Sequence, residues 1–313
     1  MVIEKTEYAN SVFEQPWWLD IVAKGKWKEV FVKQDGIVVG RMVFVRDKKR
    51  ICMPQNTQTL GPWLDNSLLV KAKGNTQLSK QKEVINKLFD QIPNNKGVDI
   101  VLDSSNEYVL PYRWMGYNYR PYFSYRINDL TDLDRIYSNF NKTVLKNIKS
   151  AQKKVRIRMG SDSEAILNLL DKTFAKQGRK VPGEKKIKKD IINKSCLYEH
   201  GITIIAEDEY GNVHSGAFLV FDEKVCYYLF GGTDSEFRSS GAQSLVLWKA
   251  IQHAAIVSKA FDFEGSNVEG IENFFRQFGG DRVINYRLTK NSLKDDLKEI
   301  MVPRVKRILG YKI

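Results

Sequence analysis

Two carboxylates in an apolar stretch are the first residues of this sequence whose types and spacing could do chemistry. Asp262 and Glu264 alternate with phenylalanine in Phe261–Ser266, which the pattern predicts to be a short strand ending in an acid and a serine. Side chains two apart in a strand share a face, so both acids would point to one cleft or to solvent. The end of such a strand often meets the ligand in open α/β sheets. Both are candidate catalytic residues, with Ser266 as a hydrogen-bonding partner of the base.

A polar loop that opens a helix is a second candidate. In Phe230–Ile251, an apolar strand runs through glycine, serine, aspartate and arginine into a helical stretch. Backbone amides at a helix start can bind a phosphate, and an arginine adds positive charge. The predicted phosphate-binding residues are Arg238, Ser239, Ser240, Gly241 and Ala242. Tyr228 precedes the loop, and its phenol could act as an acid or donor, or pack in the core with a solvated hydroxyl.

The charge balance narrows the class of partner without choosing one. The 313 residues include 50 lysine and arginine residues against 37 acids, a formal net charge of +13. A basic surface attracts nucleic acid, anionic lipid headgroups or phosphorylated small molecules. A proteome that is lysine-rich throughout would produce the same excess.

The sequence does not indicate a metalloprotein, a disulfide-rich protein or a membrane-spanning protein. Cys52, Cys196 and Cys226 lie far apart and form no CxxC pair, and the three histidines lack metal-ligand spacing. No apolar run approaches the length of a membrane span, and the first residues contain no apolar signal-peptide core. We therefore expect a cytoplasmic protein with buried free thiols, no metal and no integral membrane segment.

The two halves of the chain share a pattern. Asp99–Ser104 and Phe261–Ser266 are each an apolar strand ending in an acid and a serine. Arg113 and Arg276 follow these strands at matching distances, and each precedes an aromatic or apolar residue and a glycine. A period of about 160 residues is too long for a solenoid and indicates a duplicated domain.

The duplication predicts the domain organisation. We expect a first unit over residues 1–128, a second unit over 129–290, and a basic C-terminal helix or tail over 291–313. Each unit reads as hairpin strands, a third strand, a loop and helix, and a closing strand–helix–strand. This order predicts an α/β (α+β) fold in which each unit is a mixed, mostly antiparallel sheet with helices on both faces.

A basic helix is expected to link the units over residues 133–154. Its apolar residues form one helical stripe, and Lys142, Lys146, Lys149, Lys153 and Lys154 form the other face. The lysine face could be simply solvated, or it could contact an anionic substrate.

The order of elements resembles the GNAT acyltransferase fold. Two such units bridged by a lysine-rich helix resemble the Fem family of aminoacyl transferases and the related FemAB-like and BioF2-like domains. The stretches that carry the resemblance are Leu145–Val155, Phe261–Ser266 and Gly270–Gly280, and the likeness spans about residues 10–290. It implies an enzyme that transfers an acyl group to an amine, without a permanently bound cofactor.

The resemblance leaves the donor and the acceptor open. The leading hypothesis is an N-acyltransferase that takes an acyl group from acyl-CoA and places it on the amine of a cell-envelope or capsule precursor, a sugar or a peptide. The first alternative is a Fem-type enzyme that uses aminoacyl-tRNA to extend a peptidoglycan precursor. The second is a binding module that has kept the fold and lost the chemistry.

The resemblance also implies roles for particular residues. Phe275 and Arg276 match the position where the family often has phenylalanine and lysine, and that cation is thought to steady the donor or the oxyanion. Gln243 replaces the last small residue of the GNAT donor loop, so we expect it to crowd a pyrophosphate. The acceptor-side candidates are Gln55, Asn56, Trp63, Ser266, Asn267 and Tyr286.

Overall fold

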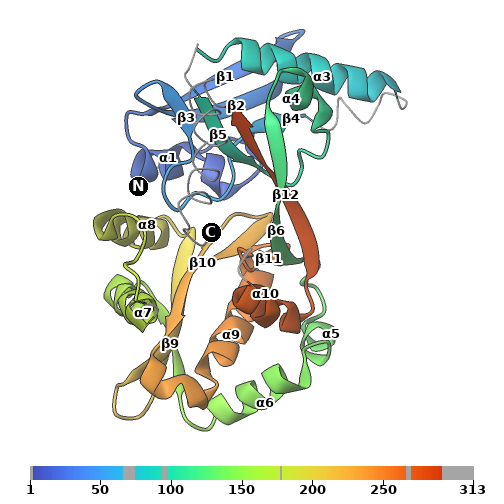
Figure 1. Cartoon of the computed structure of the whole chain (residues 1–313). Helices are drawn as coiled ribbons and strands as arrows, with labels where there is room; N and C mark the ends of the chain where they lie inside the picture. The colour runs from blue at the N-terminus through green and yellow to red at the C-terminus, as the bar shows by residue number, and fades with distance from the viewer. Residues whose placement is uncertain (1–2, 66–74, 94–96, 177, 266–268, 291–313) are drawn as a thin grey trace, which may run out of the picture. The chain divides into compact units, whose positions relative to one another are not determined.

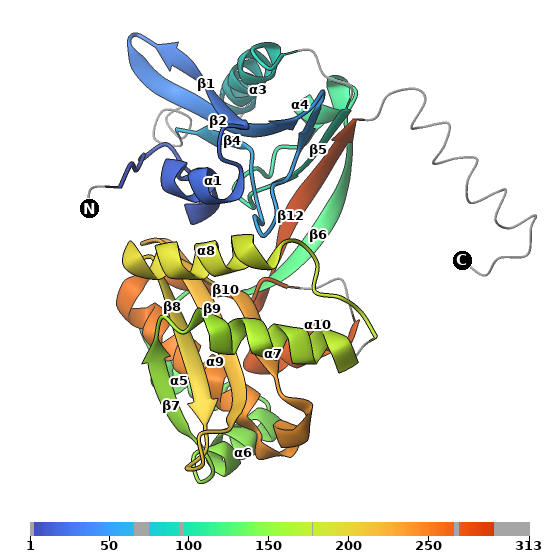
Figure 2. The ribbon, with the colours of Figure 1, turned by 90° about the vertical axis from the view of Figure 1, so that its left-hand side faces the viewer.

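The chain forms two compact units, each built from segments that are far apart in the sequence. The computed structural model in Figures 1 and 2 describes residues 3–65, 75–93, 97–176, 178–265 and 269–290. The large unit comprises Met1–Thr6, Ser11–Val22 and Tyr122–Ile284, and the small unit comprises Glu7–Asn10, Ala23–Pro121 and Asn285–Ile313. The boundaries expected at residues 128 and 290 follow the sequence duplication rather than these contacts, and they stay a prediction.

The small unit is a sheet flanked by helices α3 and α4. Its elements are β1 (Trp27–Gln34), β2 (Ile37–Asp47), β3 (Arg50–Cys52), β4 (Pro62–Leu64), α3 (Asn75–Asp90), β5 (Gly97–Leu102) and α4 (Leu110–Trp114). Asp35 and Gly36 both have positive φ, which the two-residue turn between β1 and β2 requires. The end of β12 (Asp281–Lys290) pairs antiparallel with β5, where Arg287 Nε lies 2.6 Å from Asp99 Oδ1.

In the large unit, the strands of the sheet follow the order β6-β11-β10-β9-β8-β7. Its strands are β6 (Asn118–Ile127), β7 (Arg156–Gly160), β8 (Gly201–Glu207), β9 (Val213–Phe221), β10 (Val225–Thr233) and β11 (Ala260–Asp262). Neighbours are antiparallel except β10 and β11. The mixed, mostly antiparallel sheet predicted from the sequence is confirmed.

Helices cover both faces of this sheet, as predicted. The helices of the large unit are α1 (Pro16–Val22), α5 (Leu133–Ser138), α6 (Lys142–Ala151), α7 (Ser163–Lys176), α8 (Lys185–Leu197), α9 (Ala242–Val257) and α10 (Glu269–Phe275), with short 3-10 turns η1 (Val12–Glu14), η2 (Ser235–Ser240) and η3 (Arg276–Phe278). Figure 2 shows α7 and α8 in front of the strands and α9 behind them.

The positions of α9 and β9 follow from their composition. Helix α9 is apolar on nearly every side, and it packs between the sheet and α6. Strand β9 is buried along almost its whole length and lies between β8 and β10. A strand covered on both faces reads as a continuous apolar run rather than an alternating one.

Two details differ from the expectations. The basic helix expected over 133–154 is two helices, because Asn141 caps α6 by accepting a hydrogen bond from the Thr143 amide at 2.9 Å. The strand expected over 261–266 ends at Asp262.

Two further expectations concern the C-terminal tail and helices that could cross a membrane. The basic tail expected over 291–313 lies outside the described residues. No helix within the described part of the chain combines the length and the apolar character that a membrane crossing needs.

Candidate active site

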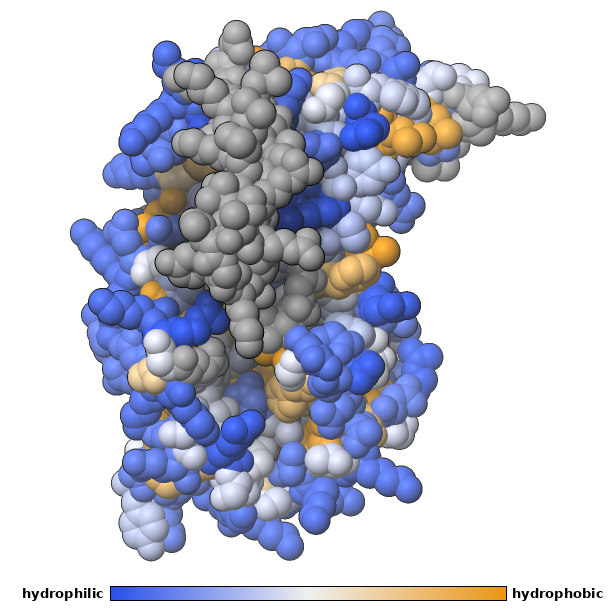
Figure 3. Space-filling view, in the orientation of Figure 1, coloured by the Kyte–Doolittle hydropathy of each residue, from blue (hydrophilic) through white to orange (hydrophobic). Residues whose placement is uncertain are grey.

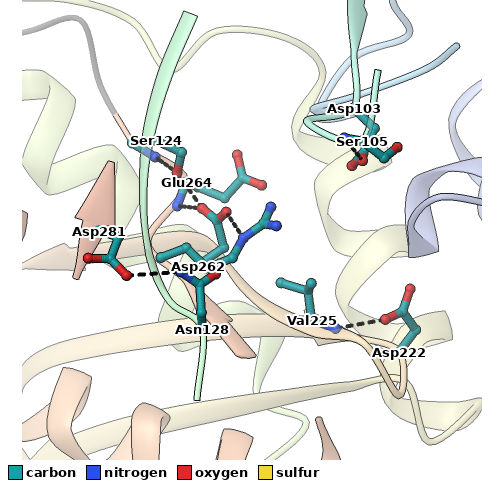
Figure 4. A network of polar contacts seen from close by, with 11 residues as sticks. Asp103, Ser105, Ser124, Asn128, Asp222, Val225, Asp262, Glu264 and Asp281 are labelled. Carbon is teal, nitrogen blue, oxygen red and sulfur yellow. Dashed lines mark hydrogen bonds and ion pairs between the residues drawn. The ribbon is translucent and has the colours of Figure 1, made fainter. Parts of the chain in front are cut away.

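Asp262 is the centre of a buried polar network at the end of β11 (Figure 4). The neighbouring strand β6 supplies two of its partners: the Ser124 hydroxyl donates to Oδ1, and Arg126 Nε donates to Oδ2 at 2.8 Å. The Glu264 amide also donates to Oδ1, at 2.8 Å, and the Gly265 amide donates to Ser124 Oγ at 2.9 Å. The three hydrogen bonds to Asp262 fix the orientation of its side chain. This arrangement favours a positioning role for Asp262, which fixes the turn that follows β11.

That turn presents Glu264 in a strained conformation. Its φ of 53° is in the left-handed region, which a residue with a β-carbon adopts at an energetic cost. Burial raises the pKa of the Glu264 carboxyl well above its usual value, and the charge of Asp262 raises it further, while Arg126 opposes the shift. Among the described residues, no group hydrogen-bonds this carboxyl. A carboxylate with a raised pKa is a stronger base, so Glu264 is suited to accept a proton from an amine.

Tyr228 and Glu264 follow the last paired residues of two parallel strands. Strands β10 and β11 pair from Val225 with Ala260 to Tyr227 with Asp262, and β11 then ends. Strand β10 continues with an irregularity just after Tyr228. The phenol and the carboxyl therefore belong to adjoining strand ends, which is the place where open sheets carry ligands.

Gln243 sets the direction of the Tyr228 hydrogen bond. The Gln243 Oε1 accepts from the hydroxyls of Ser215 and Thr233, the latter at 2.9 Å. The Nε2 of the same amide therefore faces the Tyr228 hydroxyl oxygen, at 3.2 Å, and donates to it. The Tyr228 proton is left to donate elsewhere, and burial keeps it in place by raising the pKa to about 12. The expectation that Gln243 crowds a phosphate is wrong, because its side chain is directed to β9 and β10.

The predicted phosphate loop packs against α6. Gly241 ends η2 with a φ of 80°, and a β-carbon placed on it would lie 2.6 Å from the carbonyl oxygen of Asn147 in α6. The amide of Ala242 donates to Ser240 Oγ at 3.2 Å, and the amide of Ser244 donates to the Gly241 carbonyl at 3.1 Å. Ser240, Ala242 and Ser244 are buried, whereas the loop residues before them, Arg238 and Ser239, are exposed. The start of α9 is thus occupied by the protein's own groups.

Phe275 and Arg276 point into different surroundings. Phe275 packs in the core against Phe263 and Tyr228, with ring centroids 5.4 and 5.9 Å away. Arg276 lines an open polar cavity of about 540 Å³, together with Asn139, Asn141, Asn273 and Gln277. The guanidinium donates to the Asn273 side chain and lies 3.8 Å from Glu272. The cavity offers amide groups and one cation to a polar ligand.

A second cavity, of about 290 Å³, lies between α7 and α8. The cavity is lined by apolar residues, charged residues and one glycine. They are Leu167, Leu170 and Val181; Asp171, Arg179, Lys180, Lys185 and Lys188; and Gly183. Lys188 is buried and donates to the Pro182 carbonyl, and its burial lowers the pKa of its ammonium. Lys185 is paired with Asp171 at 2.7 Å. The remaining positive charge suits an anionic group.

The family model of the acetyltransferase (GNAT) domain matches residues 138–274, which lie within the large unit. This part of the large unit resembles GNAT domains. The sequence has no match among curated proteins.

Solved structures resemble nearly the whole chain, and not the matched segment alone. The crystal structure of FemX superposes with a TM-score of 0.64 at 14% identity, covering 92% of this chain and 94% of that one. The C-terminal domain of a putative lysylphosphatidylglycerol synthetase from Agrobacterium fabrum gives 0.56 at 12% identity, covering 92% and 91%. L-PGS from Bacillus licheniformis gives 0.51 at 12% identity, covering 93% and 91%. The resemblance to the Fem family is confirmed in the fold.

The predicted site residues divide between the two units. The large unit holds Asp262, Glu264, Tyr228, Phe275, Arg276 and the loop residues Arg238–Ala242. Gln55, Asn56, Trp63 and Tyr286 belong to the small unit, where Trp63 contacts Tyr8 and Tyr286 contacts Tyr119. Ser266 and Asn267 lie outside the described residues. Their roles in substrate binding stay predictions.

Sequence reasoning missed the partners that make this site. Ser124 and Arg126 meet Asp262 only because β6 pairs with β11, and no local pattern encodes that pairing. The histidines, cysteines and acids of the described residues form no group that could hold a metal ion.

Proposed function

We propose that the protein transfers an acyl group from an ester carried by RNA to the amine of an anionic cell-envelope precursor. The match to the GNAT domain model and the FemX-like fold support an acyltransferase. The adjoining ends of β10 and β11, which carry Tyr228 and Glu264, support the chemistry.

The proposed reaction uses these two side chains. The amine attacks the ester carbonyl, and the Glu264 carboxylate accepts the proton that the nitrogen loses. The Tyr228 hydroxyl donates a hydrogen bond to the oxygen that becomes negative, because Gln243 already occupies its acceptor side. The carbon–oxygen bond of the ester then breaks, and the proton passes to the leaving hydroxyl. Asp262 holds the turn that carries Glu264 in position.

The proposed choice of donor rests on the contact between Gly241 and Asn147. A pyrophosphate such as that of CoA needs free amides and an open approach at the start of α9. Here α6 lies 2.6 Å from the β-carbon position of Gly241, and the neighbouring Ala242 amide is already bonded to Ser240. A donor with its phosphates elsewhere therefore fits better than CoA.

The lysine face of α6 offers phosphates another place to bind. Val144, Ile148 and Ala151 bury one side of this helix. The exposed side carries Lys142, Lys146 and Lys149, and the exposed Lys153 and Lys154 follow in the turn after the helix. Since α6 also contacts the donor loop, a chain of phosphates along these lysines would run past the loop. RNA supplies such a chain, and its binding would depend steeply on salt.

The acceptor assignment rests on the cavity between α7 and α8. Arg179, Lys180 and the buried Lys188 line it beside an apolar wall. A phosphate or carboxylate on the acceptor would balance their charge. Precursors of the cell envelope that carry both an anionic group and a free amine meet this requirement.

An acyl-CoA donor is the second candidate. The observation in its favour is the exposed Arg238 at the predicted donor loop, beside the exposed Ser239. Calorimetric titration of the protein with an aminoacyl-tRNA and with acetyl-CoA in parallel separates the two donors. We expect binding of the tRNA alone.

Each outcome of the titration supports or overturns a particular donor. Micromolar binding of acetyl-CoA that is lost in Arg238→Ala would overturn the RNA donor. Binding of neither ligand would favour a module without catalysis. If tRNA binds, Glu264→Gln should leave its affinity unchanged while abolishing transfer of the labelled aminoacyl group to an amine; unchanged transfer would overturn the role of Glu264.

A further inference from the structure

Helices α3 and α4 of the small unit expose apolar side chains next to cations. Trp114 is 58% exposed, Leu110 45% and Leu78 42%. Leu110 and Trp114 lie four residues apart on α4, so they share a face. Figure 3 shows apolar surface bordered by hydrophilic side chains where α4 lies beside α3.

A lysine joins the two helices across this surface. The Lys82 ammonium lies over the Trp114 ring, 4.9 Å from its centroid. Leu78 precedes Lys82 by one turn of α3, so both side chains lie on the same side of that helix. The three apolar side chains and the lysine therefore form one patch, which we call the α3–α4 patch.

Further cations surround the patch. Arg113 is exposed on α4, and its guanidinium donates to Asn118 at 3.3 Å. Lys290 Nζ donates to the carbonyl of Met115, just after α4, at 2.9 Å. The nearby acid Glu83 is already paired with Lys87 at 2.6 Å, which leaves Glu107 as the exposed acid preceding α4. The charge around the apolar side chains is positive on balance.

We propose that the α3–α4 patch docks the protein on the surface of an anionic lipid bilayer. Tryptophan is favoured at the boundary between headgroups and acyl chains, because one part of its ring system is apolar and its N–H is polar. Leucine side chains add apolar area, and lysine and arginine are attracted to anionic headgroups. The patch combines these three features, and the net charge of +13 favours approach to such a surface. A protein partner or a second copy of the chain would need no such ring of cations.

Sedimentation with vesicles tests the proposal on the full chain. The vesicles are pure phosphatidylcholine, or seven parts phosphatidylcholine to three parts phosphatidylglycerol. We expect binding to the anionic vesicles only, weakening as salt rises. The variant Leu110→Ser/Trp114→Ala should bind about tenfold more weakly, because it removes the apolar contact. The matched control is Tyr210→Ser/Ile256→Ser, which removes an aromatic and an aliphatic side chain that are 82% and 81% exposed elsewhere.

Several results would overturn the proposal. They are an absence of binding by the wild type, unchanged binding by the patch variant, or an equal loss in the control. A wild-type dimer that the patch variant converts to a monomer in sedimentation velocity would assign the patch to a second copy instead. The charge variant Lys82→Glu/Arg113→Glu leaves the apolar side chains in place, and it should also lose binding to anionic vesicles. Far-UV circular dichroism melting verifies that each variant is folded.

Discussion

Gly241 lies so close to Asn147 that a β-carbon placed on it would be 2.6 Å from the Asn147 carbonyl oxygen. The contact joins the loop before α9 to helix α6, and the positive φ of Gly241 adds a second reason for glycine. The contact is the main reason to prefer a donor other than CoA.

Gly241→Ala should therefore destabilise the protein by about 2–4 kcal/mol, from the left-handed backbone and the overpacked contact together. Urea unfolding measures the loss. The matched control is Gly211→Ala, whose φ is 81° but whose β-carbon would meet nothing within 4 Å. That variant should lose only about 1 kcal/mol. Equal losses in the two variants would mean that α6 does not press on the loop.

Asp262→Asn should cost about 3–5 kcal/mol, because it leaves the largely buried Arg126 without its counter-charge. The control is Asp129→Asn, which breaks an exposed pair with Arg135 and should cost much less. Both are measured by urea unfolding. A small loss in Asp262→Asn would contradict the central position of Asp262 in the network.

Glu264→Gln should stabilise the protein at neutral pH. The folded pKa of Glu264 lies above its unfolded value, so between the two pKa values the folded state holds a proton that the unfolded chain has released. The stability that this carboxyl contributes is complete below the unfolded pKa and is lost as the pH rises through the folded one. Urea unfolding at a series of pH values should show this decline in the wild type and its absence in the variant. Parallel curves for the two proteins would show that burial does not shift the pKa of Glu264.

Tyr228 should keep its proton until the pH reaches about 12. Carbon-13 NMR of labelled tyrosine, with Tyr228→Phe to assign the signal, measures this titration. Gln243→Leu should raise the pKa further, because the Gln243 hydrogen bond lowers it. An unchanged pKa in that variant would contradict the donor direction assigned to the Gln243 amide.

Lys146→Glu/Lys149→Glu should weaken binding of aminoacyl-tRNA at least tenfold and reduce the slope of log affinity against log salt by roughly 1.4 to 1.8. The control Lys24→Glu/Lys33→Glu makes the same change in net charge at exposed lysines of the small unit. Filter binding at several salt concentrations distinguishes them. Equal effects would show that only the net charge matters, and that α6 holds no particular phosphates.

The sequence predicted the layers of the fold better than the helix boundaries. The strand, loop and helix expected around Phe230–Ile251 are confirmed as β10, η2 and α9. The break between α5 and α6 was missed because Ile136, Phe140 and Val144 keep the helical spacing across it. All three residues pack in the same core, so the apolar period cannot reveal that the backbone changes direction.

The site was predicted only in part, and the reason is physical. Glu264 could be proposed from the sequence because an acid after an apolar strand is a local pattern. Ser124, which fixes the geometry around Asp262, is 138 residues away from it along the chain. Contacts of that separation depend on which strands pair, and single-sequence patterns do not carry that information. The orientation of the Gln243 amide likewise follows from Ser215 and Thr233, which meet it only in the folded sheet.

The division of the chain has a consequence for how the protein is made. Strand β5 leaves the ribosome early, but the residues that pair with its free side, Tyr286–Lys290, are synthesised only after the whole segment Tyr122–Ile284. At about 5–20 residues per second, this delay is on the order of ten seconds or more. During that time Asp99 lacks Arg287, and one edge of a partly formed sheet is open to other nascent chains. Chaperone demand during synthesis should therefore concentrate on the small unit, although most of it is translated first.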